Sequence, residues 1–411
     1  MPLNLLQKLE ILAEAAKYDA SCVSSGGDKR KAGKGLGSVT GQSICHAFTP
    51  DGRCVSLLKI LLTNFCKYDC IYCVSRRSSN VRRARFKVDE VVQLTLDLYR
   101  RNCIEGLFLS SGIARSADET MADLVRVART LRQEHAFRGY IHLKTIPGAS
   151  SELLDEAGLY ADRLSMNVEM PAEAALEELA PEKSATEIKQ GLARTRVKIE
   201  ASSERTRAGR ARPPRFAPAG QSTQMVVGAD SSSDRDILRA SAGLYASYAL
   251  ERVYYSAFSP TGHASASLPA RPTPLMREHR LYQADWLLRF YGFTLPEIEE
   301  ALPGGMLDLS IDPKLAWALT HRDLFPVDIN RASREMLLRV PGLGTRAVDG
   351  IIAARKHASL RLAELKRLTN SVARVRPFIT TPDWRPRALL DDAHLKDRLA
   401  PKPQQLSLAL S

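Results

Sequence analysis

Residues 56–73 read SLLKILLTNFCKYDCIYC, an apolar run that leads directly into a loop with three cysteines. The apolar run, 56–62, has the length of a buried strand. Cys66, Cys70 and Cys73 follow with three and then two intervening residues. Thiolates at these spacings can converge on one metal centre from a single loop. We therefore predict that a strand ends here in a metal-binding loop.

The same alternation of strand and helix continues along residues 56–280. Further apolar runs, which we expect to be strands, cover 106–110, 140–146, 163–169, 223–228 and 252–258. Helical patterns cover 88–102, 117–134, 150–158, 172–180 and 184–195. Alternating strands and helices are typical of parallel sheets. The pattern predicts an α/β fold with a partial (β/α)6 barrel, and a doubly wound open sheet is the alternative. In both, the active site lies at the carboxyl ends of the strands.

The composition of the 411 residues is that of an ordinary globular protein, with 44% hydrophobic and 26% charged residues. These values and the seven cysteines exclude collagen-like, disordered and disulfide-scaffold classes. Lys and Arg number 59 against 46 Asp and Glu, a formal charge of +13. This surplus favours a polyanionic partner, either nucleic acid or an anionic membrane surface.

We predict a cytoplasmic protein with no membrane partner. No stretch reaches the roughly 18 apolar residues that a membrane span needs. The N-terminal sequence, MPLNLLQKLEILAEAAKYD, lacks the basic start and the unbroken apolar core of a signal peptide. Because cytoplasmic thiols are kept reduced, closely spaced cysteines indicate a metal or catalysis rather than disulfides.

The regions flanking the barrel differ from it in composition. We predict an N-terminal segment (1–55), a barrel (56–280), a helical linker (281–325), a helical domain (326–376) and a tail (377–411). An amphipathic helix is expected at 3–17, and the Gly- and Ser-rich stretch 21–55 is expected to be loop. The Arg-, Ala- and Pro-rich stretch 200–222 is expected to be a mobile loop. The Pro-rich stretch 377–411 is expected to be a poorly ordered tail.

The three-cysteine loop resembles the signature of the radical S-adenosylmethionine (SAM) superfamily, C-x3-C-x2-C with an aromatic residue before the last cysteine, here Tyr72. The resemblance implies a 4Fe–4S cluster held by Cys66, Cys70 and Cys73, with one iron left to bind SAM. In that family, reductive cleavage of SAM yields a 5′-deoxyadenosyl radical that abstracts a substrate hydrogen, while the protein supplies binding and orientation. The resemblance also implies an electron donor such as flavodoxin or ferredoxin.

The other cysteines leave a second interpretation open. A structural zinc loop would take a fourth ligand such as Cys54 or Cys103, although zinc sites usually present paired C-x2-C knuckles and only one is present. Cys22, Cys45 and Cys54 could bind a second cluster or metal. Their spacings of 22 and 8 intervening residues match no common ligand template, so small buried residues are the favoured interpretation.

Further SAM contacts are expected from the strand ends. The superfamily often holds the SAM amino group with Gly-Gly-Glu after the second strand. The segment here, 109–112, is Leu-Ser-Ser-Gly, whose carbonyls and hydroxyls would serve instead. Lys144 would pair with the SAM carboxylate. Ser165, Asn167 and Glu169 alternate along the fourth strand, so they face either a site or a structural hydrogen-bond network. The predicted cofactor-binding residues are Tyr72, Ser110, Ser111, Gly112, Lys144, Ser165, Asn167 and Glu169.

Residues 333–356, SREMLLRVPGLGTRAVDGIIAARK, predict two short helices around a tight turn. This pattern resembles the helix-hairpin-helix family, which implies binding of a nucleic-acid backbone. Its two glycines let the backbone approach a phosphate, which the N–H groups of the second helix then face. Nothing in this arrangement reads a base. The predicted contacts are Gly342, Gly344, Thr345 and Arg346.

Local charge favours the same partner. Residues 331–376 contain 11 Lys and Arg against three Asp and Glu, a net charge of +8. This charge argues against the alternative of a protein-interaction hairpin. Arg76, Arg77, Arg82 and Arg83 form a second basic run beside the cysteine loop, and we predict that they bind nucleic acid unless they are only a solvated face.

The order of these parts resembles a group of radical SAM proteins described as acting in DNA modification or repair. The resemblance implies a SAM-dependent radical enzyme that acts on nucleic acid, with DNA favoured over RNA. An RNA-modifying radical SAM enzyme is one alternative. A zinc- or cluster-stabilised DNA-binding protein without catalysis is the other. The sequence assigns no catalytic hydrogen donor.

Overall fold

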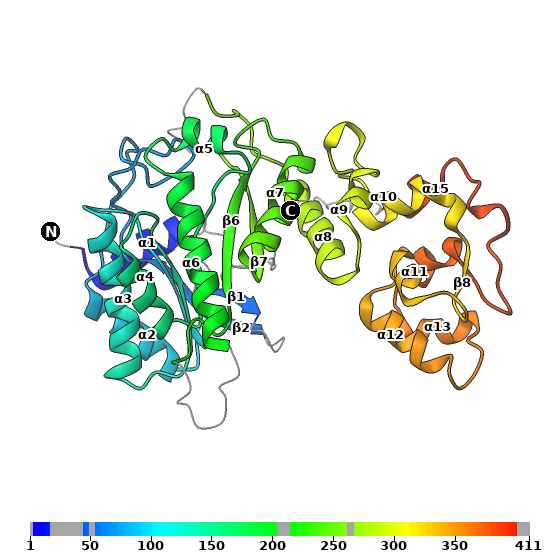
Figure 1. Cartoon of the computed structure of the whole chain (residues 1–411), viewed down its shortest axis with the longest axis horizontal. Helices are drawn as coiled ribbons and strands as arrows, with labels where there is room; N and C mark the ends of the chain where they lie inside the picture. The colour runs from blue at the N-terminus through cyan, green and yellow to red at the C-terminus, as the bar shows by residue number, and fades with distance from the viewer. Residues whose placement is uncertain (1–2, 17–43, 49–53, 204–213, 261–266, 401–411) are drawn as a thin grey trace, which may run out of the picture. The chain divides into compact units, whose positions relative to one another are not determined.

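The computed structural model describes residues 3–16, 44–48, 54–203, 214–260 and 267–400. The chain divides into two compact units (Figure 1). The first comprises Met1–Ser232 and Ala240–Thr273, and the second comprises Ser233–Arg239 and Pro274–Ser411. Among the described helices, none combines the length and apolar character that a bilayer span requires.

The first unit contains a seven-stranded sheet in the order β1-β2-β3-β4-β5-β6-β7. The strands are β1 (Ile44–Phe48), β2 (Cys54–Leu61), β3 (Gly106–Ser110), β4 (Tyr140–Lys144), β5 (Arg163–Ser165), β6 (Gln221–Val227) and β7 (Arg252–Ala257). Strands β2 to β7 are parallel, and each lies beside the next along the chain. A doubly wound sheet reverses its order at a switch point, and this one does not. The α/β fold with a half-barrel is therefore confirmed.

Helices connect the parallel strands. They are α2 (Val88–Arg100), α3 (Ala117–Gln133), α4 (Ser151–Tyr160), α5 (Glu173–Leu179), α6 (Ala185–Ser203) and α7 (Asp234–Tyr248). Helix α3 begins where the Ser116 hydroxyl accepts a hydrogen bond from the Glu119 N–H, and it contacts both α2 and α4. Its apolar face, which includes Met121 and Leu124, is fully buried. These connections leave the carboxyl ends of the strands free to form a site.

The N-terminal part of the first unit differs from expectation. Helix α1 (Leu5–Ala16) packs on β2, as its amphipathic pattern predicts. Residues 44–48, however, are not loop but strand β1, which pairs antiparallel with β2 in the register Cys45↔Leu57. The edge of β2 would otherwise expose unpaired N–H and carbonyl groups, and β1 covers them. Cys22, residues 204–213 of the expected mobile loop and residues 401–411 of the tail lie outside the described residues.

The second unit is mainly helical. Its elements are α8 (Leu275–Phe290), α9 (Leu295–Glu299), η1 (Pro303–Gly305), α10 (Pro313–Thr320), η2 (Arg322–Leu324), β8 (Val327–Asp328), α11 (Arg334–Arg339), α12 (Thr345–Ala354), α13 (Leu362–Leu368), α14 (Val372–Val375), η3 (Arg376–Phe378), β9 (Ile379–Thr380), η4 (Arg387–Leu389) and α15 (Leu395–Leu399). Residues 377–400 were expected to be a poorly ordered tail, and they are structured instead. Strand β9 pairs with β8, and Arg322 Nη1 donates hydrogen bonds to the carbonyls of Leu390 and Asp392.

Candidate active site at the carboxyl ends of the strands

A cavity of about 180 Å³ opens at the carboxyl ends of the parallel strands in the first unit. The last residues of four strands line it: Leu61 of β2, Ser110 of β3, Lys144 of β4 and Ala257 of β7. Ala15 of helix α1 also lines the cavity. This is the end of a β/α barrel at which active sites form.

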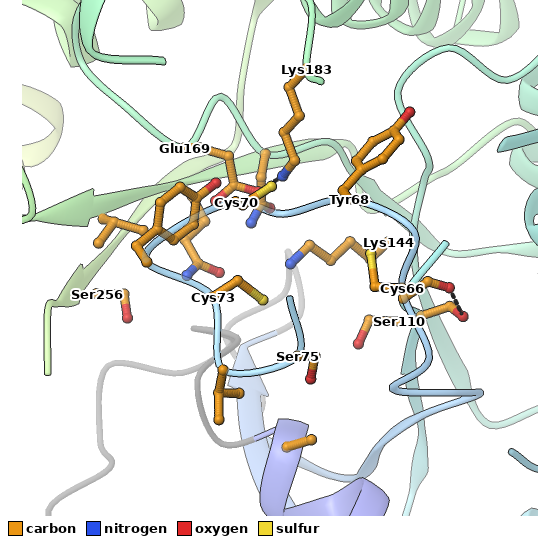
Figure 2. Close-up of a pocket in the computed structure, with 18 of the residues that line it drawn as sticks. Cys66, Tyr68, Cys70, Cys73, Ser75, Ser110, Lys144, Glu169, Lys183 and Ser256 are labelled. Carbon is orange, nitrogen blue, oxygen red and sulfur yellow. Dashed lines mark hydrogen bonds and ion pairs between the residues drawn. The ribbon is translucent and has the colours of Figure 1, made fainter. Parts of the chain in front are cut away.

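The three cysteines of the loop after β2 line this cavity together. Figure 2 shows Cys66, Cys70 and Cys73 set around one space, into which the side chain of Lys144 reaches. Within the described residues, no group of three or more His, Cys, Asp and Glu side chains is placed to hold a metal ion. Three thiols around a shared space nevertheless provide ligands for three irons of a 4Fe–4S cluster, in which each iron takes one thiolate.

Burial controls the chemistry of these thiols. It raises the pKa of Cys70 to about 12 and the pKa of Cys73 to about 11, because a thiolate is poorly solvated there. Metal coordination has the opposite effect, since a coordinating thiol is deprotonated. Tyr72 lines the same cavity, and its hydroxyl is buried without a hydrogen-bond partner in the described residues. The cavity therefore has thiol ligands for a cofactor beside a buried hydroxyl that is unsatisfied in the described residues.

The residues predicted to contact SAM gather here with one exception. Those that line the cavity are Tyr72, Ser110, Ser111, Gly112, Lys144, Asn167 and Glu169. Ser165 is buried in β5 outside the cavity lining, and its carbonyl accepts hydrogen bonds from Thr145. Gly112 is required for close packing, because a Cβ atom there would lie 2.5 Å from the carbonyl oxygen of Phe65.

Lys183 is a cavity residue that the sequence did not reveal. Its Nζ lies 2.6 Å from Glu169 Oε1, and Figure 2 shows the two side chains pointing toward each other. Glu169 turns toward this partner with a φ of 64°. Burial is the largest single effect on the pKa of Lys183 and lowers it, but Glu169, Tyr72 and Cys70 together outweigh burial, so the pKa stands well above its usual value. Lys183 follows α5 in an ordinary charged stretch, so no motif marks it.

The basic run after the cysteine loop divides into two pairs. Arg77 and Arg82 are exposed. Arg76 is buried, with Nη1 2.6 Å from the Ile71 carbonyl oxygen, and Arg83 is half-buried with its Nη atoms bonded to backbone carbonyls. The structure thus differs from the expectation that all four face a nucleic acid. A loop without regular hydrogen bonding leaves carbonyls unsatisfied, and a guanidinium supplies donors for several of them.

The predicted hairpin in the second unit consists of α11, a tight turn and α12. Gly342 has a φ of 88°, and a Cβ atom there would lie 2.9 Å from Val375 Cγ2, so the turn needs glycine. Gly344 begins α12 without a side-chain cap. The Thr345 N–H is already bonded to the Tyr291 hydroxyl, whereas the Arg346 side chain is exposed.

Part of the charge of the hairpin region is neutralised within the second unit. Arg339 pairs with Glu297 and Arg374 pairs with Asp312, acidic residues that precede the hairpin in the sequence. Arg334 pairs with Asp349 on α12. The basic residues that remain exposed there include Arg346, Lys356, Arg361, Lys366 and Arg367. The surface is therefore less basic than its composition suggests.

Comparison with known families identifies the first unit. Residues 60–206 match the family model of the radical SAM superfamily, so this part of the chain is a radical SAM domain. Members of the superfamily are enzymes that cleave SAM reductively. Enzymes of this superfamily use a 4Fe–4S cluster and SAM, and they need an electron donor. The match favours SAM-dependent chemistry over the alternative of a DNA-binding protein without catalysis.

Several solved structures are similar to part of the chain, whereas a search among curated proteins found no match. The FeFe-hydrogenase maturase HydG from Carboxydothermus hydrogenoformans is 16% identical with a TM-score of 0.42, over 56% of this chain and 49% of that one. Methylornithine synthase (PylB) is 14% identical with a TM-score of 0.44, over 56% of this chain and 61% of that one. Coproporphyrinogen III oxidase (HemN) from Escherichia coli is 14% identical with a TM-score of 0.34, over 55% of this chain and 50% of that one.

Proposed function

We propose that Cys66, Cys70 and Cys73 hold the 4Fe–4S cluster of this enzyme and leave one iron to bind SAM. The observation that carries this proposal is that all three thiols line one cavity with the residues at the strand ends. When bound, the cluster supplies the electron that cleaves SAM to a 5′-deoxyadenosyl radical. Flavodoxin or ferredoxin is the proposed source of that electron.

The remaining cavity residues bind and orient SAM. The Lys144 ammonium reaches into the space among the cysteines (Figure 2). There it pairs with the SAM carboxylate. The carbonyls and hydroxyls of Ser110 and Ser111 accept hydrogen bonds from its amino group. Asn167 and Glu169 contact the ribose or the amino group. The ion pair with Lys183 favours the ionised form of Glu169, and buried surroundings strengthen these contacts.

We further propose that the substrate is a nucleic acid, with DNA favoured over RNA and residues 326–376 as the binding domain. The sharp turn at Gly342 and the lack of a side-chain cap at Gly344 support a phosphate contact with N–H groups of α12 other than that of Thr345, which bonds to Tyr291, and the exposed Arg346 adds charge beside it. The exposed Arg77 and Arg82 lie on the segment that follows the cysteine loop. An RNA substrate remains the second candidate, because backbone contacts of this kind do not distinguish the two.

Isotope transfer tests this function. The protein is reconstituted anaerobically with iron and sulfide, reduced, and mixed with SAM and deuterated duplex DNA, duplex RNA or no nucleic acid. We expect 5′-deoxyadenosine that carries deuterium only from the DNA. Deuterium from the RNA alone would establish the second candidate, and transfer from neither would refute a nucleic-acid substrate.

A matched pair of cysteine variants tests the ligands in the same reaction. Cys70→Ala should abolish SAM cleavage. Cys103→Ala should retain it, because the Cys103 thiol lies outside the cavity lining, with Sγ 3.7 Å from the Arg101 carbonyl oxygen. Equal activity of the two variants would contradict the assignment of Cys70.

A further inference from the structure

We propose that Arg83 is a positioning residue. Its guanidinium holds the two ends of the three-cysteine loop together, and this fixes the positions of the three thiols before the cluster binds. This inference rests on the proposed cluster ligands. It assigns a structural task to a residue whose place in a basic run suggested a contact with nucleic acid.

A single guanidinium bonds to the backbone on both sides of the cysteines. Arg83 Nη1 donates to the carbonyls of Asn64 and Ser75, with a distance of 2.7 Å to the Ser75 oxygen. Arg83 Nη2 donates to the carbonyls of Arg76 and Ser79, at 2.5 and 2.9 Å. Asn64 lies two residues before Cys66, and Ser75 lies two residues after Cys73. The backbone at both ends of the three-cysteine loop is therefore bonded to the side chain of Arg83.

Local pairing fixes the backbone that carries Arg83. Thr63 and Arg85 form an antiparallel bridge. The Asn64 side chain donates to the Arg82 carbonyl and accepts from the Ala84 N–H, both at 2.8 Å. These contacts place Arg83 against the base of the loop. Arg76 Nη1 adds a hydrogen bond to the carbonyl of Ile71, between the second and third cysteines.

Four converging carbonyls favour arginine over other residues. Both hydrogens on each Nη atom have an acceptor, so the guanidinium matches the four oxygens in number and in its planar geometry. A lysine has three donors at one point and cannot reach all four oxygens. Glutamine has fewer donors still and no positive charge. Removal of the guanidinium would take this donor from all four carbonyls. Within the described residues, only the Arg76 carbonyl among them also accepts from a backbone N–H, that of Ser79, so the loss destabilises the loop locally.

Hydrogen exchange on the full-length, metal-free chain tests this role without a loaded cluster. Several amides of the loop are bonded within it or to its surroundings, including Ile71 to Leu179 O, Cys73 to Cys70 O and Arg77 to Tyr68 O. In Arg83→Gln, we expect exchange in residues 65–79 to be about tenfold faster or more, with β3 to β7 unchanged. Arg83→Lys should give a smaller increase. Arg82→Gln, which changes the exposed neighbour, should match the wild type.

Cluster loading provides a second readout. After anaerobic reconstitution, Arg83→Gln should bind less iron per chain and show a broadened electron paramagnetic resonance signal, while Arg82→Gln matches the wild type. Wild-type exchange in the loop of Arg83→Gln would overturn the proposal. A uniform loss of protection across the barrel in both Arg83 variants would also overturn the proposal, because Arg83 would then stabilise the whole barrel and not the loop in particular. The exchange result stands even if Cys70→Ala disproves the cluster ligands, so the two failures are distinguishable.

Discussion

Lys183 and Glu169 show how one residue can control the charge of the cavity. Their side chains are only 15% and 8% exposed, and the ion pair is 2.6 Å long. Lys183→Met would remove the ammonium from a buried carboxylate. We expect it to lower the free energy of unfolding by about 3 kcal/mol, because a buried charge that loses its partner is poorly solvated. Urea denaturation of the two proteins measures this difference.

Lys189→Met is the matched control for that substitution. Lys189 pairs with Glu173 at the surface, where the side chains are 52% and 58% exposed. Exposed ion pairs contribute about 0 to 1 kcal/mol, so this variant should be almost as stable as the wild type. Equal losses for Lys183→Met and Lys189→Met would show that Lys183 is not acting as a buried partner of Glu169.

Because Lys314 is buried, we expect the free energy of unfolding of the second unit to depend on pH. Burial lowers its pKa from 10.5 to about 7, although its Nζ donates to the carbonyls of Leu338 and Leu343. Between these two pKa values the unfolded chain binds this proton and the folded chain has released it. The free energy of unfolding should therefore rise with pH from about 7 upward, by about 1 kcal/mol per unit. Below pH 7 both states are protonated, and this contribution is constant.

Tryptophan fluorescence measures that dependence selectively. The three tryptophans, Trp286, Trp317 and Trp384, all lie in the second unit. Urea unfolding of the wild type and Lys314→Met is compared at pH 7, 8 and 9. The slope with pH should be smaller in the variant, and parallel pH profiles would show that Lys314 does not titrate in this range.

Single residues also show where reasoning from sequence reaches its limit. The spacing of Cys66, Cys70 and Cys73 predicted a shared metal site, and the structure brings their side chains to one cavity. The same sequence could not separate Arg83 from Arg82, because a run of arginines does not reveal which side chains face backbone carbonyls. Lys183 was missed because its partner lies 14 residues away across a turn and a helix.

Whole elements were predicted well wherever their apolar runs were continuous. Strands β2 and β3 and helices α2 and α3 lie close to the expected ranges. Strand β1 was missed because its sequence, ICHAF, is short and adjoins a Gly- and Ser-rich stretch. Strand β9 was missed because it comprises two residues and depends on a partner more than 50 residues earlier in the chain, β8. Pairing between distant segments leaves no local periodicity in the sequence.

The hairpin between α11 and α12 carries a prediction of its own. Gly342→Val would force a β-branched residue to a φ of 88° and bring its Cβ to 2.9 Å from Val375 Cγ2. The displaced turn should weaken DNA binding about tenfold and to a similar extent for all sequences, because the contact is to the backbone. SAM cleavage without DNA should not change. Fluorescence anisotropy with several labelled duplexes measures the binding.

Gly243→Ala is the control for the hairpin substitution. Gly243 lies on α7, and a Cβ atom there would meet nothing within 4 Å. DNA binding by this variant should equal that of the wild type. A loss in Gly342→Val that is confined to certain sequences would refute the phosphate-anchor role, as would unchanged binding.

At the scale of the whole molecule, the sequence predicted a barrel followed by a basic helical region. The radical SAM match covers residues 60–206 and identifies that part of the chain as a radical SAM domain. The net charge of +13 led to the prediction of a polyanionic partner, yet ion pairs such as Arg339–Glu297 neutralise part of the +8 charge counted over residues 331–376. Composition counts charges without their neighbours, which is why the nucleic-acid substrate is a proposal.

The central claim is that three cysteines hold a cluster with one iron open to SAM. Electron paramagnetic resonance of the reduced, reconstituted full-length protein tests it most directly, with and without SAM. The account predicts a 4Fe–4S signal that shifts when SAM is added in the wild type and is absent in Cys70→Ala. A signal that SAM leaves unchanged, or a full signal in Cys70→Ala, would contradict it.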